Sequence, residues 1–186
     1  IIAAGIANCK RACAPYGALT ALDVGPLGEL LEPSGTLAFE DAVAEYGRIV
    51  RAGVAAGADI LYFETFTDLY EMKAALLAAK ENSTLPIMAS MSFEANGRTF
   101  TGCTVESFAA TARGLGANAV GINCSLGPKE IFPMAKRLAE AVPGDFPVFV
   151  KPNAGLPRAD GSGYDITPQL YAMQMKPYRE LHLFAA

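Results

Sequence analysis

The sequence lacks the features by which two large classes of protein bind their partners. Its 186 residues contain no block of lysine and arginine, and 15 basic against 19 acidic side chains give a net charge of −4. Because nucleic-acid binders neutralise phosphates with clustered positive charge, no nucleic-acid partner is expected. Charge or glycine also interrupts every apolar run well before the roughly 18 residues that a membrane span needs, so no membrane partner is expected either.

The start of the chain lacks both an initiator methionine and the positive residues that open a signal peptide. Lys10 and Arg11 follow the first apolar stretch instead of preceding it. This order predicts a segment from within a longer cytoplasmic protein. With 52% hydrophobic residues, residues 1–186 are long enough to bury the core of a single domain, so a disulfide framework is unnecessary and reduced thiols are expected. The four cysteines are Cys9, Cys13, Cys103 and Cys124.

Short β-rich runs alternate with helical patterns along the whole chain. The expected strands are 18–24, 60–64, 86–93, 119–124 and 147–151, with a weaker sixth strand at 181–184. The expected helices are 3–14, 39–56, 69–80, 105–115, 128–141 and 168–179. Two of these helices have start signals, because Pro128 and Pro168 fit first-turn positions and Thr167 is a candidate N-cap. Strand and helix in alternation indicate parallel strands joined by helical crossovers, hence an α/β fold.

The length of the chain favours a barrel over an open doubly wound sheet. A (β/α)₈ TIM-type barrel has about 250 residues, or about 31 per unit, so this chain corresponds to roughly six units. No Gly-x-Gly-x-x-Gly follows any expected strand, which disfavours a dinucleotide-binding sheet. The sequence therefore predicts a partial (β/α)₈ barrel of parallel strands that lacks the first strands and the end of the last, with exposed edges.

Polar residues stand at the carboxyl ends of four expected strands. They are Asp23, Glu64, Asn123 with Cys124, and Asn153. In a parallel barrel these ends converge on one mouth, where active sites are built. We therefore expect these side chains to form a site together.

Taken alone, Cys124 is more easily explained as a packing residue, whereas Glu64 is harder to explain without a functional role. Cys124 precedes a turn into a helix, where loop amides and the helix N-terminus favour a thiolate, but a small buried cysteine is the commoner interpretation. Glu64 ends an apolar strand, and a carboxylate in such a place needs partners or water. A helix cap or a loop salt bridge is the structural alternative for Glu64.

Three short sequence motifs, spaced as successive βα units would place them, resemble those of a known family. They are Phe-Glu-Thr-Phe-Thr-Asp at 63–68, Gly-Ile-Asn-Cys-Ser-Leu-Gly-Pro at 121–128 and Lys-Pro-Asn-Ala-Gly-Leu-Pro at 151–157, with Asn-Gly-Arg-Thr at 96–99 and Tyr-Asp at 164–165 as further matches. Together they resemble the homocysteine S-methyltransferase family, and within it the homocysteine-binding domain of cobalamin-dependent methionine synthase. The likeness covers most of the chain.

The resemblance implies a zinc-dependent barrel that transfers a methyl group to the thiolate of homocysteine and so gives methionine. Zinc makes the substrate sulfur nucleophilic by expelling its proton. Cys124 matches one of three zinc cysteines, Glu64 matches the acid that binds the substrate ammonium, Asn153 matches an asparagine that approaches the metal, and Asn123 is a neighbour of the site. Methylcobalamin is the implied methyl donor, with cobalamin- and folate-binding domains elsewhere in the parent chain.

The sequence departs from the family pattern at its end. It closes with 181–186, where the family has Gly-Gly-Cys-Cys, so two of three zinc thiolates are not in this chain and little or no methyl transfer is expected of these 186 residues alone. His182 and Cys103 are not expected to replace them. Cys9 and Cys13 lie one helical turn apart and are interpreted as small packing residues.

Three alternatives remain open. In the first alternative, the parent protein belongs to the same family but is a stand-alone enzyme that uses S-methylmethionine or betaine as methyl donor. In the second, the chain is not catalytic and is a truncated barrel retained as a binding module. A phosphate-binding barrel enzyme needs a glycine-rich turn after a late strand, and Gly155, Gly161 and Gly163 are too scattered to supply it.

Overall fold

Five parallel strands form one sheet whose order follows the chain. The computed structural model describes residues 1–155, 157–158, 160–181 and 183–185. The strands, in sheet order, are β1 (Ala21–Val24), β2 (Ile60–Phe66), β3 (Ile87–Met91), β4 (Ala119–Asn123) and β5 (Val148–Lys151). All four strand pairings are parallel, as the sequence predicts, and β1 and β5 are the edge strands.

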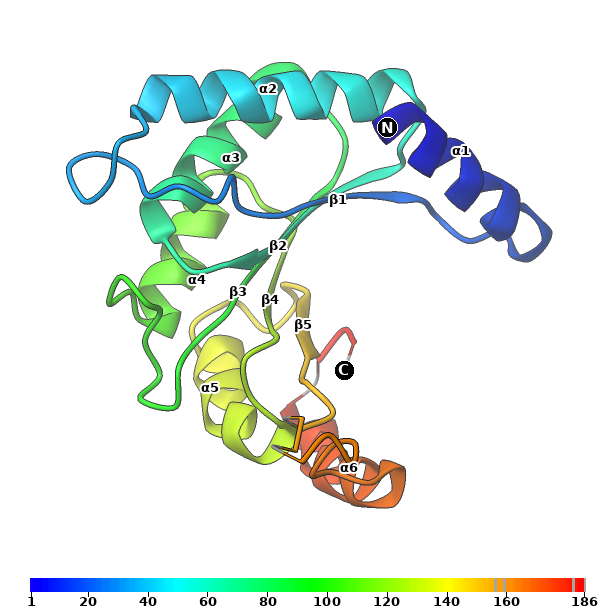
Figure 1. The fold of residues 1–186 in the computed structure, drawn as a ribbon, viewed down its shortest axis with the longest axis vertical. Helices are drawn as coiled ribbons and strands as arrows, with labels where there is room; N and C mark the ends of the chain where they lie inside the picture. Colours follow the sequence, from blue (N-terminus) through cyan, green and yellow to red (C-terminus); the bar gives the residue numbers. More distant parts are fainter. Residues whose placement is uncertain (156, 159, 182, 186) are drawn as a thin grey trace.

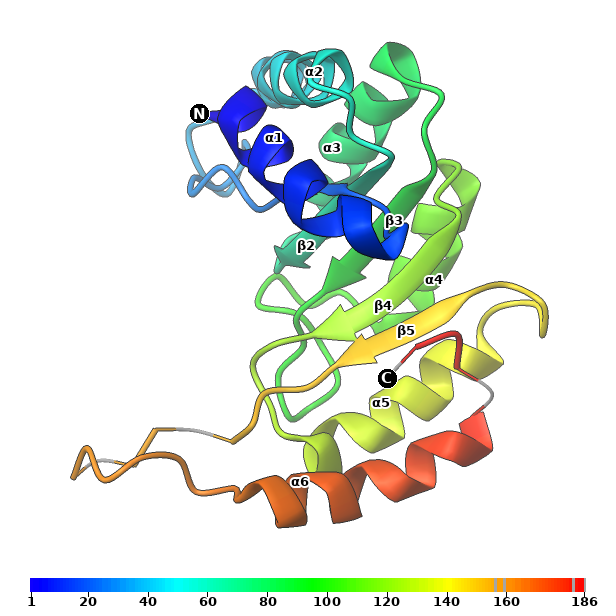
Figure 2. The ribbon, with the colours of Figure 1, turned by 90° about the vertical axis from the view of Figure 1, so that its right-hand side faces the viewer.

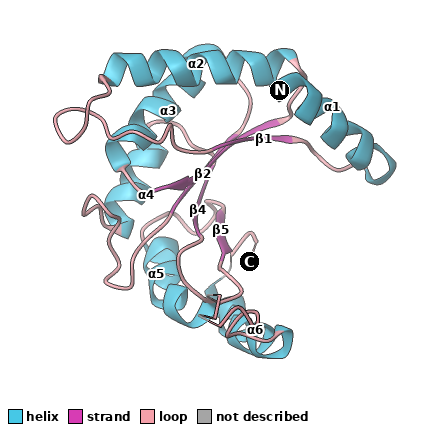
Figure 3. Ribbon diagram, in the orientation of Figure 1, coloured by secondary structure: helices cyan, strands magenta, loops and turns pink. Residues whose placement is uncertain are grey.

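Helices connect successive strands, precede the first strand and follow the last, and they lie along one side of the sheet, around which they form an arc (Figures 1 and 3). They are α1 (Ile2–Cys13), α2 (Phe39–Ala55), α3 (Leu69–Asn82), α4 (Val105–Gly114), α5 (Pro128–Glu140) and α6 (Pro168–Met175), with the short 3₁₀ helices η1 (Ala14–Tyr16) and η2 (Lys176–Leu181). The loop between β5 and α6 extends away from the body of the protein (Figure 2). Among the described residues, no helix is long and apolar enough to cross a membrane.

The core lies between the sheet and the helical arc. Alternate strand residues point into it, among them Leu61 and Phe63 of β2 and Val120 and Ile122 of β4, and all four are fully buried. The other face of the sheet carries a smaller buried cluster of Tyr62, Ala119 and Phe149. Side chains thus separate by strand parity into a packed outer face and a concave inner face.

Local signals fix where the helices begin. The Thr167 hydroxyl accepts a hydrogen bond from the backbone N–H of Leu170 at 3.2 Å, which confirms the predicted N-cap of α6. Pro128 and Pro168 occupy the predicted first turns, where a missing N–H has no cost. Asp68 caps α3 by accepting from the N–H groups of Tyr70 and Glu71.

The predicted sixth strand at 181–184 is wrong in extent. Leu181 still belongs to η2, which Tyr178 holds against α5 by donating a hydrogen bond from its hydroxyl to the Pro128 carbonyl at 2.5 Å. Among the described residues 183–185, the contact with the edge of β5 is one parallel bridge between Phe149 and Ala185. His182, which was expected on this strand, lies outside the described residues.

Replacing Phe108 with alanine is expected to lower the free energy of unfolding by about 3 to 5 kcal/mol, because a fully buried aromatic ring is lost and a cavity remains. Phe100→Ala is the matched control, since Phe100 is 69% exposed, and it should change stability by about 0.5 kcal/mol or less. Urea unfolding followed by circular dichroism measures both. Equal losses in the two variants would contradict the placement of the core between the sheet and α4.

Candidate functional site

The register of the strands brings polar inner-face residues to the same level at the carboxyl ends of the sheet. Asp23 of β1 pairs with Tyr62 of β2, and Asn123 of β4 pairs with Lys151 of β5. Glu64 lies two residues beyond Tyr62 and therefore on the same face of β2. Four strands thus contribute side chains to one concave surface.

An ion pair crosses this concave surface from β2 to β5. Lys151 Nζ lies 2.5 Å from Glu64 Oε1, although two strands separate β2 from β5. Three strand spacings on a flat sheet amount to about 14 Å, so the contact requires the sheet to curl inward as a barrel wall does. The same Glu64 oxygen accepts a hydrogen bond from the Tyr62 hydroxyl at 2.7 Å, and the Lys151 ammonium lies 5.1 Å from the Tyr62 ring centroid.

Small residues on the middle strands make room for these long side chains. A Cβ at Gly121 of β4 would overlap the ring of Phe149. With glycine there, Phe149 lies edge-on to Tyr62 at a centroid separation of 5.6 Å. Gly121 is therefore required by a close approach on the inner face, in agreement with its place in the Gly-Ile-Asn-Cys string.

The amide of Asn123 connects three strands below the mouth. Its Oδ1 accepts hydrogen bonds from the Thr65 N–H at 3.2 Å and from the Ser90 hydroxyl at 2.8 Å, and its Nδ2 donates to Thr65 Oγ1 at 2.7 Å. Thr65 has a left-handed backbone with φ 67°, which is unusual for a β-branched residue. Asn123 therefore holds the residue after Glu64 in a strained conformation, at the point where β2 shifts its register against β3 between Phe63 and Phe66.

Cys124 begins the strained turn that leads into α5. Cys124 and Ser125 have φ of 62° and 61°, and with Thr65 they are the non-glycine residues with positive φ in the described part of the chain. The Cys124 N–H donates to the Lys151 carbonyl at 3.1 Å, and the Asn153 N–H donates to the Leu126 carbonyl at 3.0 Å. Backbone strain thus collects at one edge of the sheet, which is where functional sites store it.

The charges at the mouth influence one another. Partial burial raises the pKa of Asp23, the Glu64 carboxylate raises it further, and the Lys151 ammonium opposes both. Burial is also the main reason that the pKa of Tyr62 lies far above its ordinary value, and Glu64 and Asp23 add to the increase. Tyr62 therefore stays protonated and donates its hydrogen bond to Glu64 throughout the physiological range.

The predicted site residues all lie at the carboxyl edge, but they meet in different ways. The charge of Glu64 raises the pKa of Asp23, and Asn123 accepts a hydrogen bond from the residue that follows Glu64. Cys124 and Asn153 belong to neighbouring loops that are joined by backbone hydrogen bonds. Their roles in binding stay predictions.

Sequence reasoning missed two participants, Tyr62 and Lys151. The signal for each was its place on a strand. Tyr62 precedes Glu64 by two residues on β2, and Lys151 ends β5, so both belong to the same inner face. Neither residue type has that meaning without the register, because a strand tyrosine or lysine is usually part of an ordinary surface.

The donor atoms in the described residues do not fit a zinc site of the implied kind. No three histidine, cysteine or acidic side chains there are close enough together to hold a metal ion. Cys124 supplies one half-buried thiol. Cys103 lies in the connection between β3 and α4, and burial raises the pKa of its thiol to about 11. These donors therefore fall short of the ligand set that such a zinc ion needs.

Comparison with known proteins identifies the family. The family model for homocysteine S-methyltransferase matches residues 1–185. This chain belongs to the homocysteine S-methyltransferase family. The resemblance in the sequence strings is thereby confirmed at the level of the family.

Solved structures of homocysteine methyltransferase MmuM from Escherichia coli have the same fold. The apo form is 21% identical with a TM-score of 0.76, and the match covers 99% of this chain and 66% of that one. The metallated form has the same identity and TM-score over 63% of its chain. The chain of residues 1–186 therefore spans about two thirds of the length of MmuM. Its fold is part of a TIM-type barrel, as predicted.

A more distant structural match shows that the fold alone does not determine the function. The carboxyl transferase domain of Rhizobium etli pyruvate carboxylase matches 94% of this chain at 15% identity with a TM-score of 0.59, and the match covers 27% of that chain. Different chemistries are built on similar barrels, so the function of this homocysteine S-methyltransferase family member has to be argued from its site.

Replacing Lys151 with methionine is expected to raise the pKa of Asp23 further, because the positive charge that stabilises its carboxylate is lost while Glu64 remains. Carbon-detected NMR titration of the Asp23 carboxyl measures the change. Lys10→Met is the matched control, since Lys10 pairs with Asp59 instead, and it should leave the pKa of Asp23 unchanged. An Asp23 pKa that stays constant or falls in Lys151→Met would show that the mouth is not assembled as described.

Proposed function

We propose that residues 1–186 form one homocysteine-binding barrel domain of an enzyme that transfers a methyl group to the sulfur of homocysteine and so gives methionine. The observation that carries the proposal is the Glu64 and Lys151 ion pair, which lies at the mouth of the curved sheet beside the Cys124 turn. Family membership supports the class of reaction, and the two charges of the ion pair are the groups that would bind the substrate.

Homocysteine is a zwitterion, and the two charges at the mouth are complementary to it. Glu64 binds the ammonium and Lys151 binds the carboxylate, so that one contact within the protein is exchanged for two with the substrate. Tyr62 keeps its hydrogen bond to Glu64 and so keeps that carboxylate aimed into the mouth. The Glu64 side chain is only 18% exposed, which makes its charge more effective than one on an open surface.

Fixing both ends of the amino-acid group leaves the thiol arm of homocysteine to reach the Cys124 turn. Holding a reacting atom in place is itself a large part of catalysis, because it removes the entropy cost of bringing the reactants together. Asn123 keeps the turn in register with Glu64, and Asn153 lies in the neighbouring loop. These asparagines are positioning residues in the proposal.

Zinc dependence and methyl donor belong to the proposal for the whole protein. By resemblance Cys124 would supply one thiolate to a zinc ion in the whole protein, and that ion would lower the pKa of the substrate thiol; the described residues supply no complete ligand set. We propose the methionine-synthase type, with methylcobalamin as donor and cobalamin- and folate-binding domains as partners. A stand-alone enzyme that uses S-methylmethionine or betaine, and a non-catalytic barrel module, are the competing outcomes.

Replacing Glu64 with glutamine is expected to weaken homocysteine binding by about 10-fold or more, because the charge-assisted hydrogen bond to the substrate ammonium is lost. Isothermal titration of the protein with homocysteine under reducing conditions measures the affinity. Glu140→Gln is the matched control, because Glu140 pairs only loosely with Lys136 on the surface of α5, and it should leave binding unchanged. If both variants bind homocysteine as the unmodified protein does, Glu64 is not the ammonium site.

The 186-residue chain is expected to retain much less than one zinc ion after dialysis and to form no methionine. To count only thiols near the candidate site, both Cys9 and Cys13 are first replaced by serine. Atomic emission gives the zinc content, and mass spectrometry follows methionine formation from homocysteine with methylcobalamin, S-methylmethionine or betaine. One tightly held zinc per chain would overturn the reasoning about the missing ligands, and turnover with a single donor would identify the enzyme type.

A further inference from the structure

A fully buried serine lies between two parts of the candidate site. Ser90 belongs to β3, the middle strand of the sheet. Tyr62 of β2 pairs with Met88 of β3, and Ser90 follows Met88 by two residues, so it lies on the same inner face. The Ser90 hydroxyl is 3.2 Å from the Tyr62 hydroxyl and 2.8 Å from Asn123 Oδ1 of β4. One small side chain thus connects three neighbouring strands.

The donors and acceptors around Ser90 can be assigned one by one. Asn123 Nδ2 donates to Thr65 Oγ1 and the Thr65 N–H donates to Asn123 Oδ1, so the orientation of the amide is fixed and its oxygen only accepts. The Tyr62 hydroxyl donates its one proton to Glu64 at 2.7 Å. Ser90 is therefore the donor in both of its contacts, and its single proton lies between the Tyr62 oxygen and Asn123 Oδ1.

Donation by Ser90 strengthens the hydrogen bond that Tyr62 makes to Glu64. A hydroxyl that accepts one hydrogen bond becomes a better donor of another, because the two bonds polarise each other. The pKa of Tyr62 agrees with this direction, since burial raises it and the hydrogen bond from Ser90 acts against the increase. Without Ser90, the buried Tyr62 oxygen loses a partner and the Glu64 carboxylate is held less firmly.

The second acceptor connects Ser90 to the backbone beside the same acid. Asn123 Oδ1 binds both the Ser90 hydroxyl and the N–H of Thr65, the residue that directly follows Glu64. Thr65 has the left-handed φ of 67°, which needs support from its neighbours. Ser90 therefore influences Glu64 at its carboxylate, through a tyrosine, and at its backbone, through an asparagine.

We propose that Ser90 is a positioning residue for substrate binding, which acts through Tyr62 to hold the Glu64 carboxylate in place for the substrate ammonium. This rests on the proposed function, in which Glu64 binds homocysteine. Ser90 is fully buried, so it acts on the substrate through its neighbours and not by direct contact. Removing its hydroxyl is expected to weaken binding while the fold is kept.

NMR of the substrate-free protein tests the contact on which the proposal depends. The carbon-13 shift of a tyrosine Cζ reports hydrogen bonding at its hydroxyl, so the Tyr62 signal should move in Ser90→Ala and return in Ser90→Thr, which restores a hydroxyl. Ser92→Ala is the matched control, because Ser92 is also buried but donates to the Asn123 carbonyl, and it should leave the Tyr62 signal in place. A Tyr62 signal that ignores Ser90→Ala would overturn the proposal.

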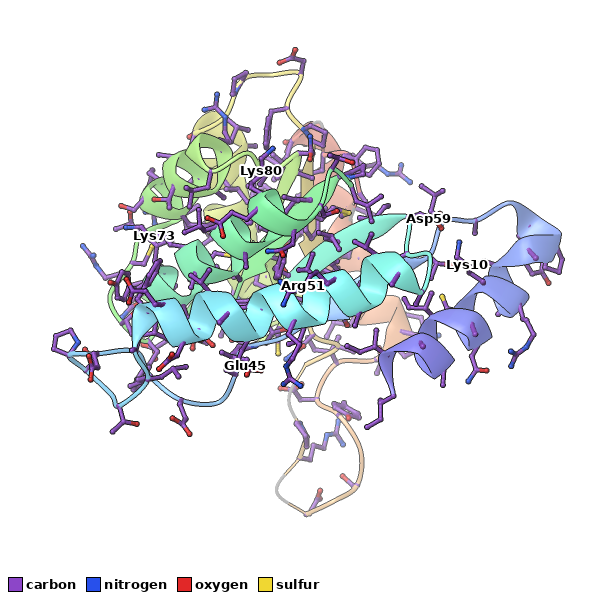
Figure 4. The ribbon with its side chains drawn as sticks, turned by 90° about the horizontal axis from the view of Figure 1, so that it is seen from above. Lys10, Glu45, Arg51, Asp59, Lys73 and Lys80 are labelled. Carbon is purple, nitrogen blue, oxygen red and sulfur yellow. The ribbon has the colours of Figure 1, made fainter. Side chains whose placement is uncertain are left out.

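Isothermal titration with homocysteine under reducing conditions then tests positioning. Ser90→Ala is expected to bind about 3- to 10-fold more weakly, as the loss of one buried hydrogen bond predicts. In a Tyr62→Phe background the same change should cost less than about 2-fold, because the route through Tyr62 is already broken. Lys80→Met changes an exposed charge on α3, on the helical side of the sheet (Figure 4), and should leave the affinity unchanged.

The outcomes separate this proposal from the proposed function. Unchanged affinity in Ser90→Ala, or equal losses with and without the Tyr62 hydroxyl, would refute the role of Ser90 while homocysteine binding stands. Absence of homocysteine binding by the unmodified protein would contradict the proposed function, and the role of Ser90 with it. Far-ultraviolet circular dichroism checks that each variant is folded. Ser90→Cys, whose thiol is a weaker donor of similar shape, supplies the same test if Ser90→Ala does not fold.

Discussion

The contact between Glu64 and Lys151 depends on the curvature of the sheet, and the candidate site depends on that contact. Two strands lie between the partners, so only a curved inner face lets their side chains meet. The inner face can curve because Gly121 lets the Phe149 ring lie across β4, while the helices bury the other face. With Lys151 56% exposed, the ion pair itself contributes little to stability. Its physical importance is to place two opposite charges at one mouth.

Backbone strain at the same edge has a local explanation. Thr65, Cys124 and Ser125 each occupy a conformation that costs about 1 to 3 kcal/mol. The Asn123 amide offsets part of this cost at Thr65 with three hydrogen bonds to neighbouring strands, and the carbonyl of Asn123 accepts a fourth from the Ser92 hydroxyl. One asparagine thus binds the residue that follows Glu64 and itself precedes Cys124, so it links the backbone beside the acid to the backbone beside the thiol.

The α/β class, the parallel strands and the helix starts follow from periodicity and from caps such as Thr167, because these depend on residues close in sequence. The carboxyl-edge placement of Glu64 and Cys124 follows too, since all parallel strands end on one side. The partnership of Lys151 with Glu64 does not follow, because it depends on register and curvature over four strands. Tyr62 shares the face of Glu64 by strand parity alone, but parity does not say that its hydroxyl reaches the carboxylate. The predicted strand at 181–184 was wrong in extent because the burial of Tyr178 extends η2 to Leu181.

The four cysteines show why residue type alone does not determine thiol chemistry. Cys103 is desolvated, and its pKa of about 11 keeps it protonated near neutral pH, so it is a poor ligand despite its place in a loop near the mouth. Cys124 lies in a strained turn before α5, whereas the thiols of Cys9 and Cys13 share a hydrogen bond of 3.8 Å on α1. The four thiols thus lie in different parts of the fold, because Cys103 and Cys124 lie in the connections that follow β3 and β4, whereas Cys9 and Cys13 lie on α1 before β1.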